Sequence, residues 1–170
     1  TIGPAREGAL LGMAGGSSAA FDKARPVLEK LTRRLEHMGP AGSGSAMKLA
    51  INLPLMVYWS ALGEALGLVL KRGIDPAQAL DILADSSGAI GAAKKRVPPI
   101  RDMLQTGEPG EVNFSLANAL KDMKLMEAQS KANGRASPVI SAARAKAEAA
   151  AADGFAEIDC SMVGLHGQTK

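Results

Sequence analysis

The sequence predicts a mainly α-helical fold preceded by a short β/α segment. Aromatic residues make up only 3% of the 170 residues, whereas Ala, Leu and Met, which favour helices, are abundant. Few aromatic and β-branched residues leave little material for strands. The hydrophobic pattern changes near residue 40, from a strand–helix–strand order to continuous helical spacing. We therefore expect a β/α piece over residues 1–40 and an all-helical domain over residues 41–170.

The β/α piece is predicted from short apolar runs and the turn residues between them. An apolar run over residues 9–14, followed by two glycines, is typical of a buried strand that ends in a turn. Ser17 or Ser18 can then cap a helix that runs to about Leu35. A second short strand is expected over residues 35–38.

The longest predicted helix runs from Ala46 to Lys71 and is apolar nearly all round, which predicts burial on several sides. Pro54 lies inside it and should kink it, because proline removes a backbone donor and clashes with the preceding turn. Gly73 is a natural stop. Asp75 followed by Pro76 is an N-cap and first helical position, so a further helix is expected to follow.

Helical patterns continue to the end of the chain. A helix that opens at Ser86 or Ser87 is expected to end at Pro98 and Pro99. The remaining predicted segments are a short turn to Leu104, residues 115–132, residues 137–152 and a final short helix capped by Asp159.

Charge and composition argue against several classes of protein. The net charge is +3, and the Lys and Arg residues are spread among acidic residues, so no nucleic-acid partner is expected. The one dense basic run, Lys94 to Arg96, is interpreted as a solvated helix face. Cys160 is the only cysteine, and we interpret it as a small buried residue. Paired Cys and His patterns typical of zinc sites are absent, so no metal is expected.

No membrane partner is predicted either, because no stretch of about 20 apolar residues lacks charge. No signal peptide is visible, so a cytoplasmic location is expected. His37 falls near the end of a predicted strand and His166 near the C-terminus, and neither forms a convincing Ser–His–Asp arrangement.

Gly42, Ser43 and Gly44 superficially resemble the start of a dinucleotide-binding fingerprint. The third glycine position is Met47, however, and the chain continues as one long helix, so we reject that interpretation. Such glycines do allow close backbone approach, and free amides at a helix start can hold an anion such as a carboxylate.

Lys48 and Asn52 are the polar pair that stands out within the apolar segment. Their spacing of four residues places them on one face of the predicted helix. One interpretation is a lysine that reaches to the surface beside an incidental asparagine. The other is a desolvated lysine that gives and takes a proton, with Asn52 orienting the lysine or a substrate oxygen.

A resemblance to a known family favours the second interpretation. Residues 42–52 resemble the G-x-G-x-x-x-K-x-x-x-N signature of β-hydroxyacid dehydrogenases, which include 3-hydroxyisobutyrate dehydrogenase and glyoxylate/succinic semialdehyde reductases and are related to 6-phosphogluconate dehydrogenase. Residues 114–122 resemble the family's F-x-L-x-x-x-x-K-D segment. Near the start, Ala5, Gly8 and Leu10 fit the end of the family's S-G-G-x-x-x-A-x-x-G-x-L segment, which places Thr1 on its second glycine.

The resemblance implies a helical domain like the C-terminal domain of 6-phosphogluconate dehydrogenase, preceded by a short β/α remnant of a Rossmann domain. The family carries most of its cofactor site in that Rossmann domain, and a chain that begins with Thr1 is therefore expected to be a fragment. The implied roles are a general acid/base at Lys48, substrate binding by Thr1, Asn52, Phe114 and Asp122, and a cofactor contact by Lys121. Thr1 departs from the family's glycine.

The implied activity is hydride transfer between NAD or NADP and a small, carboxylate-bearing 3-hydroxy acid or its semialdehyde. The family buries the equivalent long helix between subunits, so we expect a homodimer or homotetramer. Tyr58 and Trp59 would be interface anchors, or else core aromatics. The alternatives are a catalytically silent helical dimerisation fragment and an imine reductase-like relative, in which the lysine is usually replaced.

Overall fold

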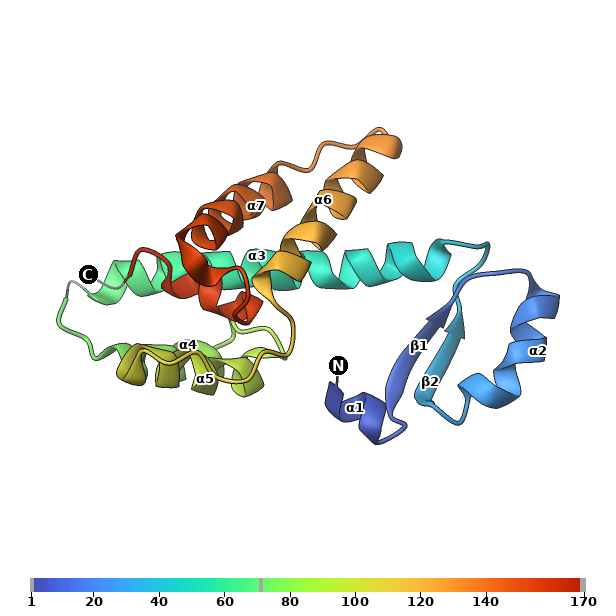
Figure 1. The fold of residues 1–170 in the computed structure, drawn as a ribbon, viewed down its shortest axis with the longest axis horizontal. Coiled ribbons are helices and arrows are strands. Elements are labelled where there is room, and N and C mark those ends of the chain that lie inside the picture. Colours follow the sequence, from blue (N-terminus) through green and yellow to red (C-terminus); the bar gives the residue numbers. More distant parts are fainter. Residues whose placement is uncertain (1, 71, 169–170) are drawn as a thin grey trace. The chain divides into compact units, whose positions relative to one another are not determined.

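The computed structural model describes residues 2–70 and 72–168, and it confirms the predicted mainly helical fold. Figure 1 shows a two-stranded β/α segment followed by a series of helices. The chain divides into two compact units, Thr1–Asn52 and Leu53–Lys170, which we describe one at a time. This division falls inside one long helix, and the expected domain boundary at residues 40 and 41 stays a prediction.

The β/α unit begins with α1 (Ile2–Arg6), which the sequence pattern did not predict. Strands β1 (Leu10–Ala14) and β2 (Thr32–His37) flank α2 (Ser18–Leu28). The strands pair in parallel, from Leu10 opposite Thr32 to Ala14 opposite His37. The β–α–β order was therefore predicted correctly.

The predicted length of α2 was wrong. The helix begins as expected, with the Ser17 hydroxyl accepting the backbone N–H of Ala20 at 3.2 Å, but it ends at Leu28 and not near Leu35. The residues from Thr32 onward hydrogen-bond to β1 as a strand. Pairing with a distant strand therefore overrides a local apolar spacing that also fits a helix.

Helix α3 (Ser43–Leu70) is one continuous helix of 28 residues, and its backbone stays helical on both sides of Pro54. In the helical unit, α3 buries a single stripe at spacings of three and four residues: Met56, Trp59, Leu62 and Leu66. Leu68, by contrast, is 79% exposed. The prediction of burial on several sides is therefore wrong for this chain taken by itself.

By length and composition alone, α3 could cross a membrane, and one third of its most apolar window is buried in the structure. The expectation that no stretch of about 20 apolar residues lacks charge still holds for α3, because Lys48 and Glu64 lie within it. Glu64 interrupts the apolar sequence, and core helices of proteins without a membrane segment can have the same composition. The helix is therefore weak evidence for a membrane.

The helical unit continues with α4 (Pro76–Asp85), α5 (Ala93–Thr106), α6 (Leu116–Ala132) and α7 (Pro138–Ala150). Two short helices follow, η1 (Ala151–Phe155) and η2 (Cys160–Leu165). Helix α4 packs on α5, and α6 packs on α7 (Figure 1). As predicted, Asp75 and Asp159 cap their helices with side-chain oxygens, and Ser115, where a helix was expected to begin, also acts as a cap.

The prediction for α5 was wrong at both ends. The helix begins at Ala93, well after Ser86, and runs through Pro98 and Pro99 to Thr106. Two prolines cost the helix backbone hydrogen bonds, but the neighbouring Val97 and Ile100 are almost fully buried. Packing of these side chains stabilises a helix that the local sequence disfavours.

The C-terminal short helix η2 lies against α3 through two glycines. A Cβ atom added to Gly63 would lie 2.2 Å from the carbonyl oxygen of Gly164, and one added to Gly164 would lie 3.0 Å from the carbonyl oxygen of Trp59. The Gln168 side chain donates to the Gly63 carbonyl at 2.6 Å on the same side. Backbone thus packs directly on backbone, which any larger residue at position 63 would prevent.

We expect Gly63→Ala to destabilise the helical unit by about 1–3 kcal/mol, because the added methyl overlaps backbone atoms that cannot rotate away. Gly67→Ala on the same helix is the matched control. Its Cβ would come no closer than 3.6 Å to Gln168, so it should stabilise the protein by roughly 0.5–1 kcal/mol. Urea unfolding of both variants measures the difference, and equal stabilities would contradict the packing argument.

Candidate active site

The start of α3 is held close to the end of β1 by glycines. Gly42 has φ +92°, a backbone conformation that side chains rarely adopt. Gly44 is buried, and a Cβ atom there would lie 2.3 Å from the carbonyl oxygen of Met13. Both glycines of the G-x-G pattern are therefore explained by backbone geometry, which brings the first turn of α3 against the sheet.

One turn further along α3, Lys48 and Asn52 form the predicted pair. The Lys48 ammonium Nζ donates a hydrogen bond to Asn52 Oδ1 at 2.9 Å. Asn52 is only 6% exposed, whereas the Lys48 side chain is exposed. Within the β/α unit Lys48 thus lies at the surface, and the sheltered surround expected for it stays a prediction. The geometry nevertheless fixes the amine beside a buried amide.

His37, at the end of β2, has a structural role. Its Nε2 lies 2.8 Å from the carbonyl oxygen of Gly16, which can only accept, so Nε2 carries the proton. The ring also stacks on Phe21, with 4.6 Å between ring centroids. These contacts hold the β1–α2 turn to β2 within the β/α unit.

The second predicted segment lies at the start of α6. The Ser115 hydroxyl accepts the backbone N–H of Asn118 at 3.3 Å and so begins the helix directly after Phe114, which is half-buried. Lys121 and Asp122 follow on α6, with Lys121 Nζ 3.9 Å from Asp122 Oδ1. The Lys121 side chain is 66% exposed, whereas Asp122 is mostly covered.

The predicted site residues fall in both compact units. Lys48 and Asn52 belong to the β/α unit, and Phe114, Lys121 and Asp122 belong to the helical unit. Thr1 lies outside the described residues. Within each unit the structure brings predicted neighbours together, as for Lys48 with Asn52 and Lys121 with Asp122.

A buried ion pair beside Phe114 was missed by the sequence analysis. Asp159, 3% exposed, accepts from Arg96 Nη1 at 2.5 Å and from the backbone N–H of Phe114 at 3.2 Å. The solvated-face interpretation of the basic run therefore holds for the exposed Lys94, which pairs with Asp85, but is wrong for Arg96. A spacing of 63 residues left no local signal for this pair.

Burial by itself would raise the pKa of Asp159. The hydrogen bonds from Ser161 and the charge of Arg96 outweigh it, so the pKa lies below its ordinary value. The carboxylate therefore stays charged in the folded protein, and the stability it adds is present above the unfolded pKa and is lost as the pH falls through the folded pKa.

Among the described residues, no group of three or more His, Cys, Asp or Glu side chains is placed to hold a metal ion. The candidate for chemistry that the sequence and the geometry share is the amine of Lys48 with its amide neighbour. A lysine amine at this position can transfer a proton, and the exposed cation of Lys121 can pair with an anionic ligand.

Residues 42–165 match the protein family described as NAD-binding of NADP-dependent 3-hydroxyisobutyrate dehydrogenase. This match spans well over half of the chain, and the chain belongs to this family of NAD-binding dehydrogenase domains. The resemblance to β-hydroxyacid dehydrogenases is thereby confirmed, and the expected cofactor class, NAD or NADP, agrees with the family description.

Individual relatives support the same family membership. The chain is 31% identical to glyoxylate/succinic semialdehyde reductase 1 of Arabidopsis thaliana over 94% of its own length and 54% of the relative. A 3-hydroxyisobutyrate dehydrogenase of Pseudomonas aeruginosa is 39% identical over 51% of the chain and 29% of the relative. The chain thus spans about half the length, or less, of the curated relatives it matches.

Solved structures show the same fold. A Mycobacterium tuberculosis 3-hydroxyisobutyrate dehydrogenase with L-serine has a TM-score of 0.79 and 29% identity, and the match covers 99% of this chain and 58% of that one. A Salmonella typhimurium 3-hydroxyisobutyrate dehydrogenase has a TM-score of 0.84 and 25% identity, over 96% and 56%.

Cys160 follows Asp159 and is expected to be unreactive in the folded protein. Burial, together with the charge of Asp159, raises the pKa of its thiol to about 12, so almost no thiolate is present near pH 8. Iodoacetamide at pH 8 should therefore leave the native protein unlabelled and label it fully in guanidinium chloride, as read by intact mass. Rapid labelling of the native protein would contradict this burial.

Proposed function

We propose that the protein is an NAD(P)-dependent oxidoreductase that transfers a hydride between nicotinamide and a small 3-hydroxy acid or its semialdehyde, with Lys48 as general acid/base. The observation that carries the proposal is the 2.9 Å contact of Lys48 with Asn52, at the motif that the resemblance predicts. Family membership and relatives named as 3-hydroxyisobutyrate dehydrogenase and semialdehyde reductase support the substrate class.

The proton transfer follows from the donors and acceptors of an amine. In oxidation of the alcohol, neutral Lys48 accepts the hydroxyl proton while the carbon loses its hydride. In reduction, the charged ammonium returns a proton to the carbonyl oxygen. Because a neutral amine still has two N–H donors, it can keep its bond to Asn52 Oδ1 while its lone pair faces the substrate. Asn52 would thus hold the amine in one direction in both protonation states.

Phe114, Asp122 and Thr1 are proposed to bind the substrate together with Asn52. Phe114 is half-buried, so part of its ring surface is available for an apolar contact. Asp122 lies two turns further along α6 and can accept a hydrogen bond from a hydroxyl group. Thr1 is proposed only from its position in the family's carboxylate-binding segment.

Among the described residues, Lys121 is the one that fits a phosphate-bearing cofactor. Lys121 presents an exposed ammonium on α6, which suits a contact with an anionic group of NAD or NADP. When bound, the nicotinamide ring supplies or accepts the hydride. Since Lys48 is exposed in this chain, we propose that the bound cofactor and substrate provide the shelter that efficient proton transfer requires.

We expect Lys48→Ala to lower kcat by roughly 10²–10⁴-fold, the range typical of lost general acid–base catalysis. The measurement is steady-state oxidation of 3-hydroxyisobutyrate and reduction of succinic semialdehyde by the full-length protein. Lys95→Ala, which removes another exposed lysine, is the control and should keep wild-type rates. Turnover of Lys48→Ala at the wild-type rate would reject the assignment.

We also propose that the protein assembles as a homodimer or homotetramer. The face of α3 opposite its buried stripe forms a groove of about 430 Å³ with α7, lined mainly by the apolar Val57, Ala61, Val139 and Ala142. Trp59 is 1% exposed within the helical unit and is thus a core residue, not an anchor; the half-buried Tyr58 stays the proposed anchor.

Assembly through this groove predicts that Val139→Glu shifts the protein to a monomer, because a charge would be buried against apolar surface. Leu125→Glu is the control, since Leu125 is similarly exposed on α6 but does not line the groove. Sedimentation velocity measures both. A wild-type monomer at high concentration, or dissociation of both variants, would overturn the proposal.

The exposed apolar face of α3 also favours the alternative of a catalytically silent dimerisation fragment. Wild-type protein that assembles but shows no turnover with either cofactor would support it. The other alternative, an imine reductase-like enzyme, is disfavoured by Lys48. A cytoplasmic location stays a proposal, and one relative is named as chloroplastic.

A further inference from the structure

We propose that Arg96 and Asp159 act as a positioning pair, which fixes the backbone at Phe114 and thereby sets the affinity for the hydroxy-acid substrate without touching it. This inference rests on the proposed function, which assigns Phe114 and Asp122 to substrate binding. Neither Arg96 nor Asp159 belongs to a motif on which the resemblance depends.

Every acceptor position of the Asp159 carboxylate is used. Its Oδ2 accepts from Arg96 Nη1 at 2.5 Å and from the backbone N–H groups of Asn113 at 3.0 Å and Phe114 at 3.2 Å. Its Oδ1 accepts from the backbone N–H of Ser161 at 3.1 Å and from the Ser161 hydroxyl at 2.7 Å. A carboxylate offers about four lone-pair sites, so five donors saturate it.

Burial makes this arrangement hard to rearrange. Asp159 is almost fully buried, so its charge cannot be solvated without local unfolding, and the Arg96 side chain is only 19% exposed. A buried carboxylate that loses its cation is left uncompensated, which costs far more than loss of a surface pair. The pair of Arg96 with Asp159 therefore ties α5 to the segment before α6. This tie is firmer than the exposed pair of Lys94 with Asp85, which joins α5 to α4.

Phe114 is fixed through its own backbone. Its N–H donates to Asp159, and its carbonyl oxygen accepts from the N–H of Cys160 at 2.9 Å. The preceding residues 107–113 are exposed and belong to no helix or strand, so they offer little packing to hold the ring. The backbone at Phe114, directly before the Ser115 cap of α6, is thus held by this buried carboxylate.

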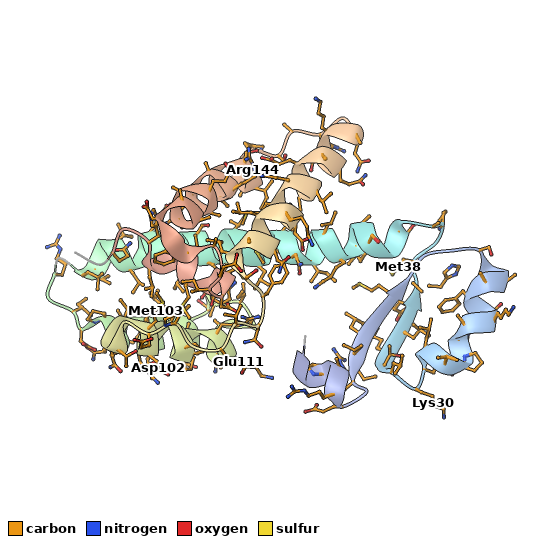
Figure 2. The ribbon with its side chains drawn as sticks, in the orientation of Figure 1. Lys30, Met38, Asp102, Met103, Glu111 and Arg144 are labelled. Atoms are coloured by element: carbon orange, nitrogen blue, oxygen red, sulfur yellow. The ribbon has the colours of Figure 1, made fainter. Side chains whose placement is uncertain are left out.

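A second arginine, Arg144, allows the positioning of Phe114 to be separated from the general stability of the helical unit. Arg144 on α7 (Figure 2) pairs with Glu127 on α6 at 2.8 Å and is also largely covered. This contact lies toward the other end of α6 from Phe114. Loss of either arginine should destabilise the helical unit. Only loss of Arg96 should change substrate binding.

The test uses the full-length protein and the variants Arg96→Met, Arg96→Lys and Arg144→Met. We expect Arg96→Met to raise KM for the hydroxy acid about 10-fold with less than a twofold change in KM for the cofactor. Arg96→Lys keeps the charge and should recover part of the affinity. Arg144→Met should lower Tm by a similar amount while KM stays at the wild-type value.

Amide hydrogen exchange of the folded variants provides a readout that does not depend on turnover. The N–H groups of Asn113 and Phe114 should exchange at least 10-fold faster in Arg96→Met than in wild type or Arg144→Met. Wild-type KM and unchanged exchange in Arg96→Met would overturn the positioning role, even with a lowered Tm. An inactive wild-type protein would instead overturn the proposed function, and the substrate part of this inference with it.

Discussion

The helical unit depends on the buried carboxylate of Asp159. It collects donors from α5, from the residues before α6 and from the start of η2, three segments that are far apart in the sequence. Since a buried charge is tolerated only when it is fully paired, these segments cannot separate without a large cost in free energy. The carboxylate thus fixes the backbone at Asn113 and Phe114, directly before the Ser115 cap at which α6 begins.

Close approach of backbones is the second constraint, and it acts in both units. In the β/α unit, Gly44 lets the first turn of α3 lie on the carbonyl of Met13. In the helical unit, Gly63 and Gly164 let η2 lie on α3. In each unit, α3 is thereby held by main-chain contacts that a larger side chain would prevent.

The chemistry of Lys48 depends on what covers it. An exposed amine is a poor partner for a reaction that moves a proton to or from a bound substrate, because water competes for that proton. The chain spans about half the length of its curated relatives. Its part in the proposed reaction is the Lys48 amine, the Asn52 amide that the amine contacts, and the exposed cation of Lys121 on α6. In the proposed enzyme, bound cofactor and substrate complete the shelter that this chain alone leaves open.

The sequence by itself determined those features that depend on neighbours within one or two helical turns. These include the long helix α3, the caps at Asp75 and Asp159, and the contact of Lys48 with Asn52. Tertiary structure decided the end of α2 and the passage of α5 through two prolines, where strand pairing and core packing outweigh local preference. It also decided the pairing of Arg96 with Asp159, because burial of two charges depends on segments that meet only in the folded chain.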